Sequence, residues 1–112
     1  MNRIKAALAG AFVVVCSGAV AQAETAAQAG DVDAGASRYA MNCVNCHGNA
    51  GQGMASFPGI QGRDAAYITE KLETYRAREM VGPNSAIMMS LAADLSDADI
   101  ANLAAYIEAR FN

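Results

Sequence analysis

Histidine and cysteine are scarce in this chain of 112 residues, which contains one histidine and three cysteines. A structural zinc site normally takes four Cys or His ligands, arranged as two pairs some distance apart along the chain. One histidine beside one closely spaced pair of cysteines is too few for such a site. The length is sufficient for one small domain and too short for a large catalytic scaffold.

Basic residues are also in short supply, since eight Lys and Arg stand against eleven Asp and Glu. Two of the basic residues, Arg3 and Lys5, belong to the first 23 residues, so the rest of the chain has a net charge of −5. Binding to nucleic acid depends on Lys and Arg side chains that neutralise phosphates. The acidic balance therefore argues against a nucleic-acid partner and permits docking to a basic protein surface.

The chain lacks an unbroken apolar run of the length that a membrane span needs. The apolar stretch of residues 6–23 is interrupted by glycine, serine and glutamine and barely reaches the roughly 20 residues required. A basic start, this apolar stretch and Ala21-Gln22-Ala23 before Glu24 together match a secretory signal peptide. Cys16 follows Val15, whereas a lipoprotein site would have a small residue there. We predict a cleaved signal peptide over residues 1–23.

Runs that alternate between apolar and polar residues are missing after the signal peptide, so strands are not expected and the predicted fold class is all-α. Residues 24–30 are small and polar and are expected to form a flexible N-terminus, followed by one domain over residues 31–112. Capping residues and apolar periodicity predict three helices: from Asp31 or Asp33 to Cys43, after Asp64, and after Ser96. The glycines of residues 48–62 indicate a loop. A second loop is expected over residues 80–87, and a short helical turn over residues 88–94.

One motif carries the chemistry, the C-x-x-C-H sequence Cys43-Val44-Asn45-Cys46-His47. In this pattern two thiols add across the two vinyl groups of one porphyrin, and the adjacent imidazole binds the iron. A thiol–disulfide oxidoreductase is one alternative, but there the C-x-x-C pair opens a helix after a strand, whereas this motif ends a helix. A plain disulfide would close a very small loop and leave His47 without a role. The motif therefore predicts one covalently bound haem c.

Several segments outside the motif extend this interpretation to a family. Gly35 and Tyr39 precede Cys43 by eight and four residues, and Leu103 and Tyr106 occupy the terminal helix. With the segment Phe57-Pro58-Gly59-Ile60-Gln61-Gly62, they make residues 31–111 resemble a small class I cytochrome c of the bacterial periplasmic type. The resemblance implies that the first and last helices cross, that loops wrap one haem, and that the loop containing Pro58 lies on the histidine side of the haem.

The resemblance also implies a sixth iron ligand. A second histidine is not available, and position removes Met1, Met41 and Met54, which leaves Met80, Met88 and Met89. The family's pattern M-x-x-x-A-x-x-L-S fits Met88, Ala92, Leu95 and Ser96, which favours Met88 as the axial ligand. Met89 is the alternative, because adjacent residues of a helical turn point about 100° apart and only one of them can face the iron.

One departure from the family concerns the end of the second helix. Many relatives have a glycine between the helix end and the next basic residue, whereas this chain has Ala77 and Arg78 at that point. The loop that follows is therefore expected to be set differently.

The function that the resemblance implies is transfer of single electrons in the periplasm between a redox protein donor and acceptor, by a carrier that is not itself an enzyme. Two alternatives remain at this point. The domain could be the cytochrome subunit of a dehydrogenase or oxidase complex, or a haem sensor or peroxidase whose sixth ligand is labile. No membrane span is expected in the mature chain, which would be a monomer or a subunit of a small complex.

Overall fold

A computed structural model describes residue 10 and residues 29–112 of the chain. The predicted signal peptide over residues 1–23 and most of the predicted flexible segment over residues 24–30 lie outside these described residues. None of the helices in the described part has the length and continuous apolar character of a membrane-spanning segment.

Five helices follow one another along the described chain: α1 (Val32–Asn42), α2 (Val44–His47), α3 (Ala65–Arg76), α4 (Ser85–Ala92) and α5 (Asp97–Phe111). Within residues 29–112 the only β pairing is an isolated bridge between Met54 and Phe57. The predicted all-α class is therefore confirmed. The three predicted helices also begin where expected, because the side chains of Asp31, Asp64 and Ser96 accept hydrogen bonds from the first free backbone N–H groups.

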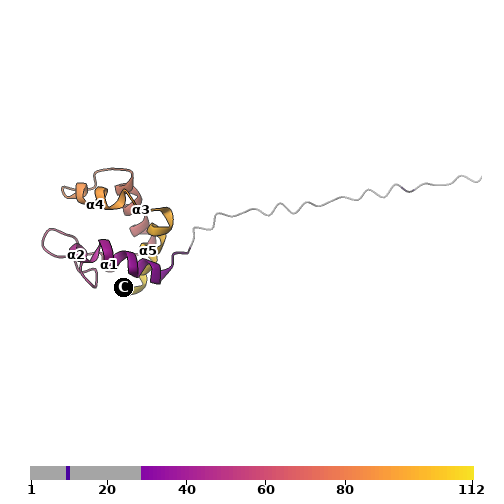
Figure 1. Cartoon of the computed structure of the whole chain (residues 1–112), viewed down its shortest axis with the longest axis horizontal. Coiled ribbons are helices and arrows are strands. Elements are labelled where there is room, and N and C mark those ends of the chain that lie inside the picture. The colour runs from indigo at the N-terminus through magenta and orange to yellow at the C-terminus, as the bar shows by residue number, and fades with distance from the viewer. Residues whose placement is uncertain (1–9, 11–28) are drawn as a thin grey trace, which may run out of the picture.

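The first and last helices of the domain cross, with α1 lying against α5 (Figure 1). At the crossing Gly35 approaches so closely that a Cβ atom there would lie 2.7 Å from Cβ of Tyr106. The rings of Tyr39, Tyr106 and Phe111 pack edge to face or tilted beside this contact, with centroids 5.2–5.4 Å apart. The predicted crossing is confirmed, and the glycine is what allows it.

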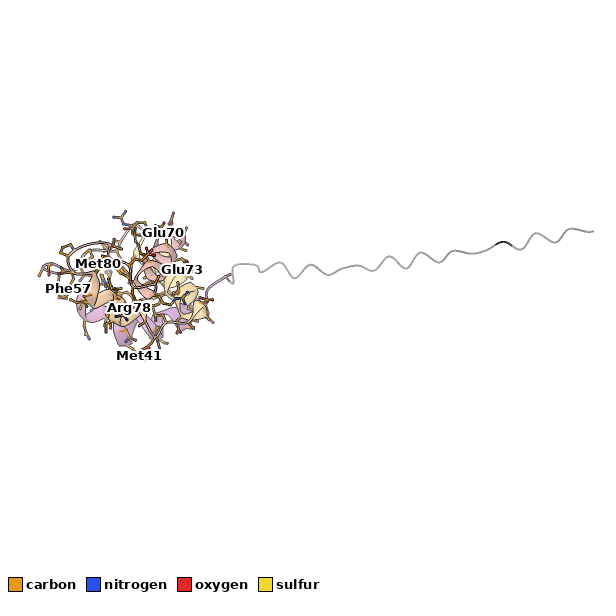
Figure 2. The ribbon with its side chains drawn as sticks, turned by 90° about the horizontal axis from the view of Figure 1, so that it is seen from above. Met41, Phe57, Glu70, Glu73, Arg78 and Met80 are labelled. Atoms are coloured by element: carbon orange, nitrogen blue, oxygen red, sulfur yellow. The ribbon has the colours of Figure 1, made fainter. Side chains whose placement is uncertain are left out.

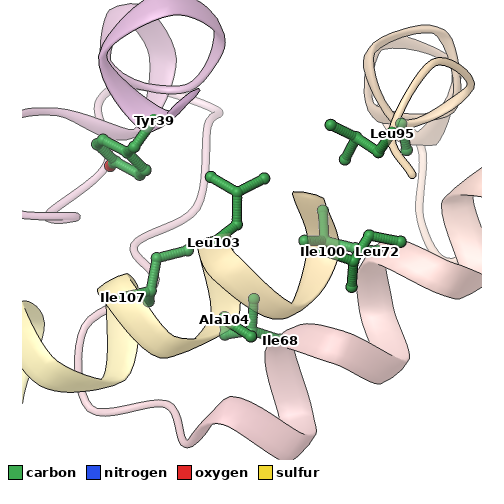
Figure 3. Close-up of a cluster of buried hydrophobic side chains, with 9 residues drawn as sticks. Tyr39, Ile68, Leu72, Leu95, Ile100, Leu103, Ala104 and Ile107 are labelled. Carbon is green, nitrogen blue, oxygen red and sulfur yellow. The ribbon is translucent and has the colours of Figure 1, made fainter. Parts of the chain in front are cut away.

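Helix α3 is amphipathic and presents its acidic side to solvent. Glu70 and Glu73 lie on its outer side (Figure 2), whereas Ile68 and Leu72 are buried. The buried side packs on α5, whose Ile100 and Leu103 are each only 1% exposed. Figure 3 shows how this core joins α1, α3 and α5 with the segment after α4, through Tyr39, Ile68, Leu72, Leu95, Ile100, Leu103, Ala104 and Ile107.

Helix α4 begins earlier than the sequence pattern predicted. The expected loop over residues 80–87 ends at Asn84, and a helix of eight residues over Ser85–Ala92 replaces the expected turn over residues 88–94. The cause is the hydroxyl of Ser85, which is buried and accepts hydrogen bonds from the N–H groups of Val81 and Gly82 at 2.8 and 2.7 Å. These bonds fold the end of the loop onto the first turn of the helix.

The end of α3 adopts a conformation that is typical of glycine, although arginine stands at that position. Arg78 has a φ of +63°, in the left-handed region that glycine usually occupies. Its N–H donates to the carbonyl of Tyr75 at 2.9 Å, and the N–H of Glu79 donates to the carbonyl of Thr74 at 3.1 Å. These two bonds form a Schellman ending, built here with arginine at the position of the usual glycine.

Candidate haem-binding site

The C-x-x-C-H motif folds as a single helical turn. Cys43 ends α1 and precedes α2, and its carbonyl accepts hydrogen bonds from the N–H groups of Cys46 at 3.3 Å and His47 at 3.0 Å. Residues three and four positions apart on a helix lie on the same side. Both sulfur atoms and the imidazole therefore face the same way, and all three residues line one cavity.

The two thiols of the motif are free, so the structure contains no disulfide between Cys43 and Cys46. Burial raises the pKa of the Cys43 thiol to about 11, although the positive charge of Arg38 acts in the opposite direction. Both side chains are half-buried. They are thus placed for addition to a group inside the cavity and are shielded from bulk solvent.

The imidazole of His47 is fixed by the loop that follows it. Its Nδ1 lies 2.8 Å from the carbonyl oxygen of Pro58, and His47 is only 8% exposed. Because a carbonyl oxygen can only accept, Nδ1 donates the proton and Nε2 retains a lone pair. This arrangement orients a histidine for binding a metal through Nε2. Pro58, which the family resemblance placed on the histidine side, thus acts through its backbone carbonyl.

Glycines bend the loop so that Pro58 reaches His47. Gly53 has a φ of +73°, and a Cβ atom there would lie 2.5 Å from the carbonyl oxygen of Phe57. Its N–H donates to the carbonyl of His47 at 2.7 Å. On the other side of the motif, the buried hydroxyl of Tyr39 donates to the carbonyl of Gly48 at 2.7 Å, and burial raises the pKa of this hydroxyl. The loop and α1 together hold the imidazole in one orientation.

Two adjoining cavities, of about 270 and 180 Å³, lie beside this imidazole. They share one set of eight lining residues: Cys43, His47, Pro58, Leu72, Tyr75, Val81, Met88 and Leu103. The walls are mainly apolar, and no Asp or Glu of the described chain lines either cavity. The site can therefore accept a large apolar group and offers it one imidazole and two thiols.

The methionines of the chain differ sharply in their positions. Met41 and Met80 are 64% and 67% exposed and lie at the outside of the molecule (Figure 2), and Met54 is 49% exposed. Met88 and Met89 are both half-buried, but Met88 lines both cavities whereas Met89 lines neither. The structure thus brings Met88 to the same cavities as His47, from a different part of the chain.

Arg38 and Ser85 are among the cavity residues that sequence reasoning missed. Ser85 has a signal in the sequence, because it precedes Met88 by three residues and so shares a side of α4 with it. Arg38 directly precedes Tyr39 on α1, and its position next to a core aromatic residue gave no indication of a cavity.

The described residues fit a covalently bound haem. Two free thiols and an imidazole with an available lone pair face one apolar cavity, and Met88, which carries a thioether sulfur, lines the same cavity. These are the donors that a c-type haem takes, and apolar walls are what a porphyrin ring requires.

Comparison with known proteins gives the same result. Residues 32–110 match the Cytochrome c family. The chain is 43% identical over 79 residues to cytochrome c-554(548) of Halomonas halodenitrificans, covering 70% of this chain and 94% of that protein. It is 38% identical over 87 residues to cytochrome c-554(547) of Halothiobacillus neapolitanus, covering 70% and 96%. It is also 40% identical over 77 residues to a thiosulfate dehydrogenase electron acceptor of Stutzerimonas stutzeri, covering 67% of this chain and 34% of that protein.

Fold and site together define a class of small helical proteins that hold a haem through a C-x-x-C-H turn. The chain belongs to the cytochrome c family. Its cofactor is covalently bound haem c, and its function is electron transfer.

Proposed function

We propose that the chain is a periplasmic electron carrier in which Cys43 and Cys46 attach the haem and His47 and Met88 are the axial iron ligands. One observation supports this most strongly: His47 and Met88 line the same two cavities, from α2 and α4. These helices lie at the same end of the domain (Figure 1). Nε2 of His47 has its lone pair available because Nδ1 donates to Pro58.

The residues of the chain hold the cofactor and exclude water. When bound, haem c supplies an iron that gains or loses one electron. Pro58 keeps the imidazole in one orientation, and His47 and Met88 would hold the iron. The described chain places no carboxylate in the cavities and engages the Nδ1 proton of its only histidine. With His47 and Met88 both holding the iron and no carboxylate of the described residues lining the cavities, electron transfer would be favoured over peroxidase chemistry.

The same proposal includes export to the periplasm and docking to a redox partner. The signal-peptide pattern over residues 1–23 supports cleavage after Ala23 and a periplasmic location. The net charge of −5 after cleavage supports a partner with a basic docking surface. Similarity to a thiosulfate dehydrogenase electron acceptor supports a second candidate role, that of the electron-accepting partner or subunit of a dehydrogenase.

The ligand assignment is tested with Met88→Ala and its neighbour Met89→Ala, a matched pair on the same helix. A methionine–iron bond gives ferric haem a weak absorption band in the far red. We expect this band in the wild type and in Met89→Ala, and its loss in Met88→Ala because the sulfur is removed. The reverse result would assign Met89, and a wild type without the band would indicate the labile site of a sensor or peroxidase.

Location is tested separately by mass spectrometry of the protein recovered from a periplasmic fraction. The expected product begins at Glu24 and carries the mass of one haem. A haem-loaded chain that retains its first 23 residues would contradict cleavage while leaving the ligand assignment intact.

A further inference from the structure

Arg38 is a cation placed against the haem cavity. It lies on α1, lines the larger cavity, and has a side chain that is only 29% exposed. Its Nε is buried and has no hydrogen-bond partner in the described part of the chain. The described residues therefore leave one donor of this cation without an acceptor.

The counter-charge nearest to Arg38 is a weak one. An oxygen of Asp99 lies 3.6 Å from the Arg38 guanidinium, which is beyond hydrogen-bond distance. The same carboxylate oxygen already accepts a hydrogen bond from the N–H of Ser96 at 3.0 Å, as part of the capping box of α5. Asp99 is therefore committed to the helix end and only partly offsets the charge of Arg38.

Arg76 provides an internal contrast. Its side chain is 30% exposed, almost the same fraction as that of Arg38. It donates to Asp97 at 2.7 Å and to the carbonyl of Leu95 at 3.1 Å, and it lines neither cavity. The two arginines thus differ in pairing and position, and not in exposure.

Two other cations line the smaller cavity, but both are placed differently. Arg63 and Lys71 lie over the ring of Tyr67, at 4.7 and 5.4 Å from its centroid, and Tyr67 is itself 37% exposed. Lys71 also has Glu70 3.6 Å away. The side chain of Lys71 is 31% exposed, so Lys71 differs from Arg38 in the cavity that it lines and in its contact with the Tyr67 ring, and not in exposure.

We propose that Arg38 raises the reduction potential of the bound haem, with Asp99 setting how much of that effect remains. The inference rests on the proposed function. Reduction adds one electron to the iron without adding a proton, so the haem becomes more negative by one charge. A positive charge beside a cavity of low dielectric favours the more negative form. Arg38 thus acts on the haem through the electric field of its charge and not through a bond.

The test is a spectroelectrochemical titration of the haem-loaded protein, after the far-red band has shown that the methionine ligand is intact. We expect Arg38→Gln to shift the redox equilibrium towards the oxidised form by roughly threefold to tenfold, the effect of removing one partly screened charge. Arg38→Lys should restore most of the wild-type potential. Asp99→Asn, which keeps an oxygen for the helix cap, should shift the equilibrium towards the reduced form.

Arg76→Gln is the matched control, expected to lower stability but to shift the redox equilibrium less than about twofold. The proposal is overturned if Arg38→Gln has the wild-type potential or moves it no more than Arg76→Gln does. If Arg38→Gln fails to load haem, Asp99→Asn decides, and the absence of a shift towards the reduced form rejects the proposal. A wild type without the far-red band would instead refute the ligand assignment.

Discussion

The two walls of the haem cavity differ in the hydrogen bonds that fix them in place. The attachment wall consists of α2 and the loop of residues 48–62. There the ring of His47 donates a hydrogen bond to the carbonyl of Pro58, and the backbone carbonyl of His47 accepts one from the N–H of Gly53. The methionine wall consists of residues 77–92, where the start of α4 is held by the hydroxyl of Ser85, which accepts from the N–H groups of Val81 and Gly82. Of its apolar side chains, Met80 is 67% exposed, and Val81, Ile87 and Leu91 line the larger cavity.

Under the ligand assignment proposed above, the difference indicates which of the two ligands is fixed and which can be displaced. The imidazole cannot rotate without breaking its bond to Pro58, so the fifth ligand is held independently of the iron. Met88 depends on the position of a short helix whose start relies on the hydroxyl of Ser85. We expect Met88 to dissociate from the iron before His47 does when the protein is destabilised.

The largest effect is expected at the attachment wall, from the double variant Cys43→Ser/Cys46→Ser. Without covalent attachment the two cavities lose the group that fills them, and so small a domain has little other core. Haem staining after denaturing electrophoresis should be negative, and circular dichroism should show loss of most helix. Asn45→Ser, an exposed change inside the same motif, should leave both signals unchanged. A helical apoprotein would contradict the prediction.

A smaller effect is expected at the methionine wall, from Ser85→Ala. The N–H groups of Val81 and Gly82 lose their acceptor, which should cost about 1 to 2 kcal/mol of unfolding free energy in a denaturant titration. Added imidazole should also displace the methionine ligand at a lower concentration. Ser90→Ala, an exposed change on the same helix, should alter stability by less than about 0.5 kcal/mol. Equal effects of the two variants would contradict the role of Ser85.

Arg78→Gly should strengthen the methionine wall. Arginine at a φ of +63° is strained, whereas glycine adopts this conformation readily and is only more flexible when unfolded. We expect a gain of about 0.5 to 1 kcal/mol in unfolding free energy. Ala77→Gly is the control, since Ala77 has an ordinary φ of −72° and glycine there should give no gain. A loss of stability in Arg78→Gly would show that the arginine side chain makes a compensating contact.

The smallest effect concerns how the stability of the protein depends on pH through Asp99, in the first turn of α5. Hydrogen bonds from Ser96 hold the pKa of Asp99 below its ordinary value of 3.8. A lowered pKa in the folded state stabilises the protein above that ordinary value, and the contribution is lost as the pH falls through the lowered pKa. Thermal unfolding of Asp99→Asn below pH 4 should therefore depend less on pH than that of the wild type. Parallel curves would contradict this.

Much of the fold could be predicted because the relevant interactions are local. The caps at Asp31, Asp64 and Ser96 involve residues two or three positions apart, so the sequence pattern contains both partners. The C-x-x-C-H motif likewise folds as one turn. The crossing of α1 and α5 was predicted from the family resemblance, since no local pattern links Gly35 to Tyr106.

The remainder depends on contacts between distant residues. The early start of α4 follows from a buried hydroxyl that accepts from the preceding loop, and burial is not visible in a short polar segment. The choice between Met88 and Met89 depends on how α4 rotates against α3. The position of Arg38 depends on α5, because Asp99 lies 61 positions further along the chain. Tertiary packing, and not local propensity, decides these features.

The crossing of α1 and α5 also determines how this domain can be joined to others. The N–H of Asp31 donates to the side chain of Asn102 at 2.7 Å, so the start of the domain is tied to its last helix. Neither Asp31 nor Phe111 lines the haem cavities. A further unit fused before α1 or after α5 would be attached beside the same crossing. The fold therefore suits modular assembly, in which units are added in series while each redox site stays clear of the joints.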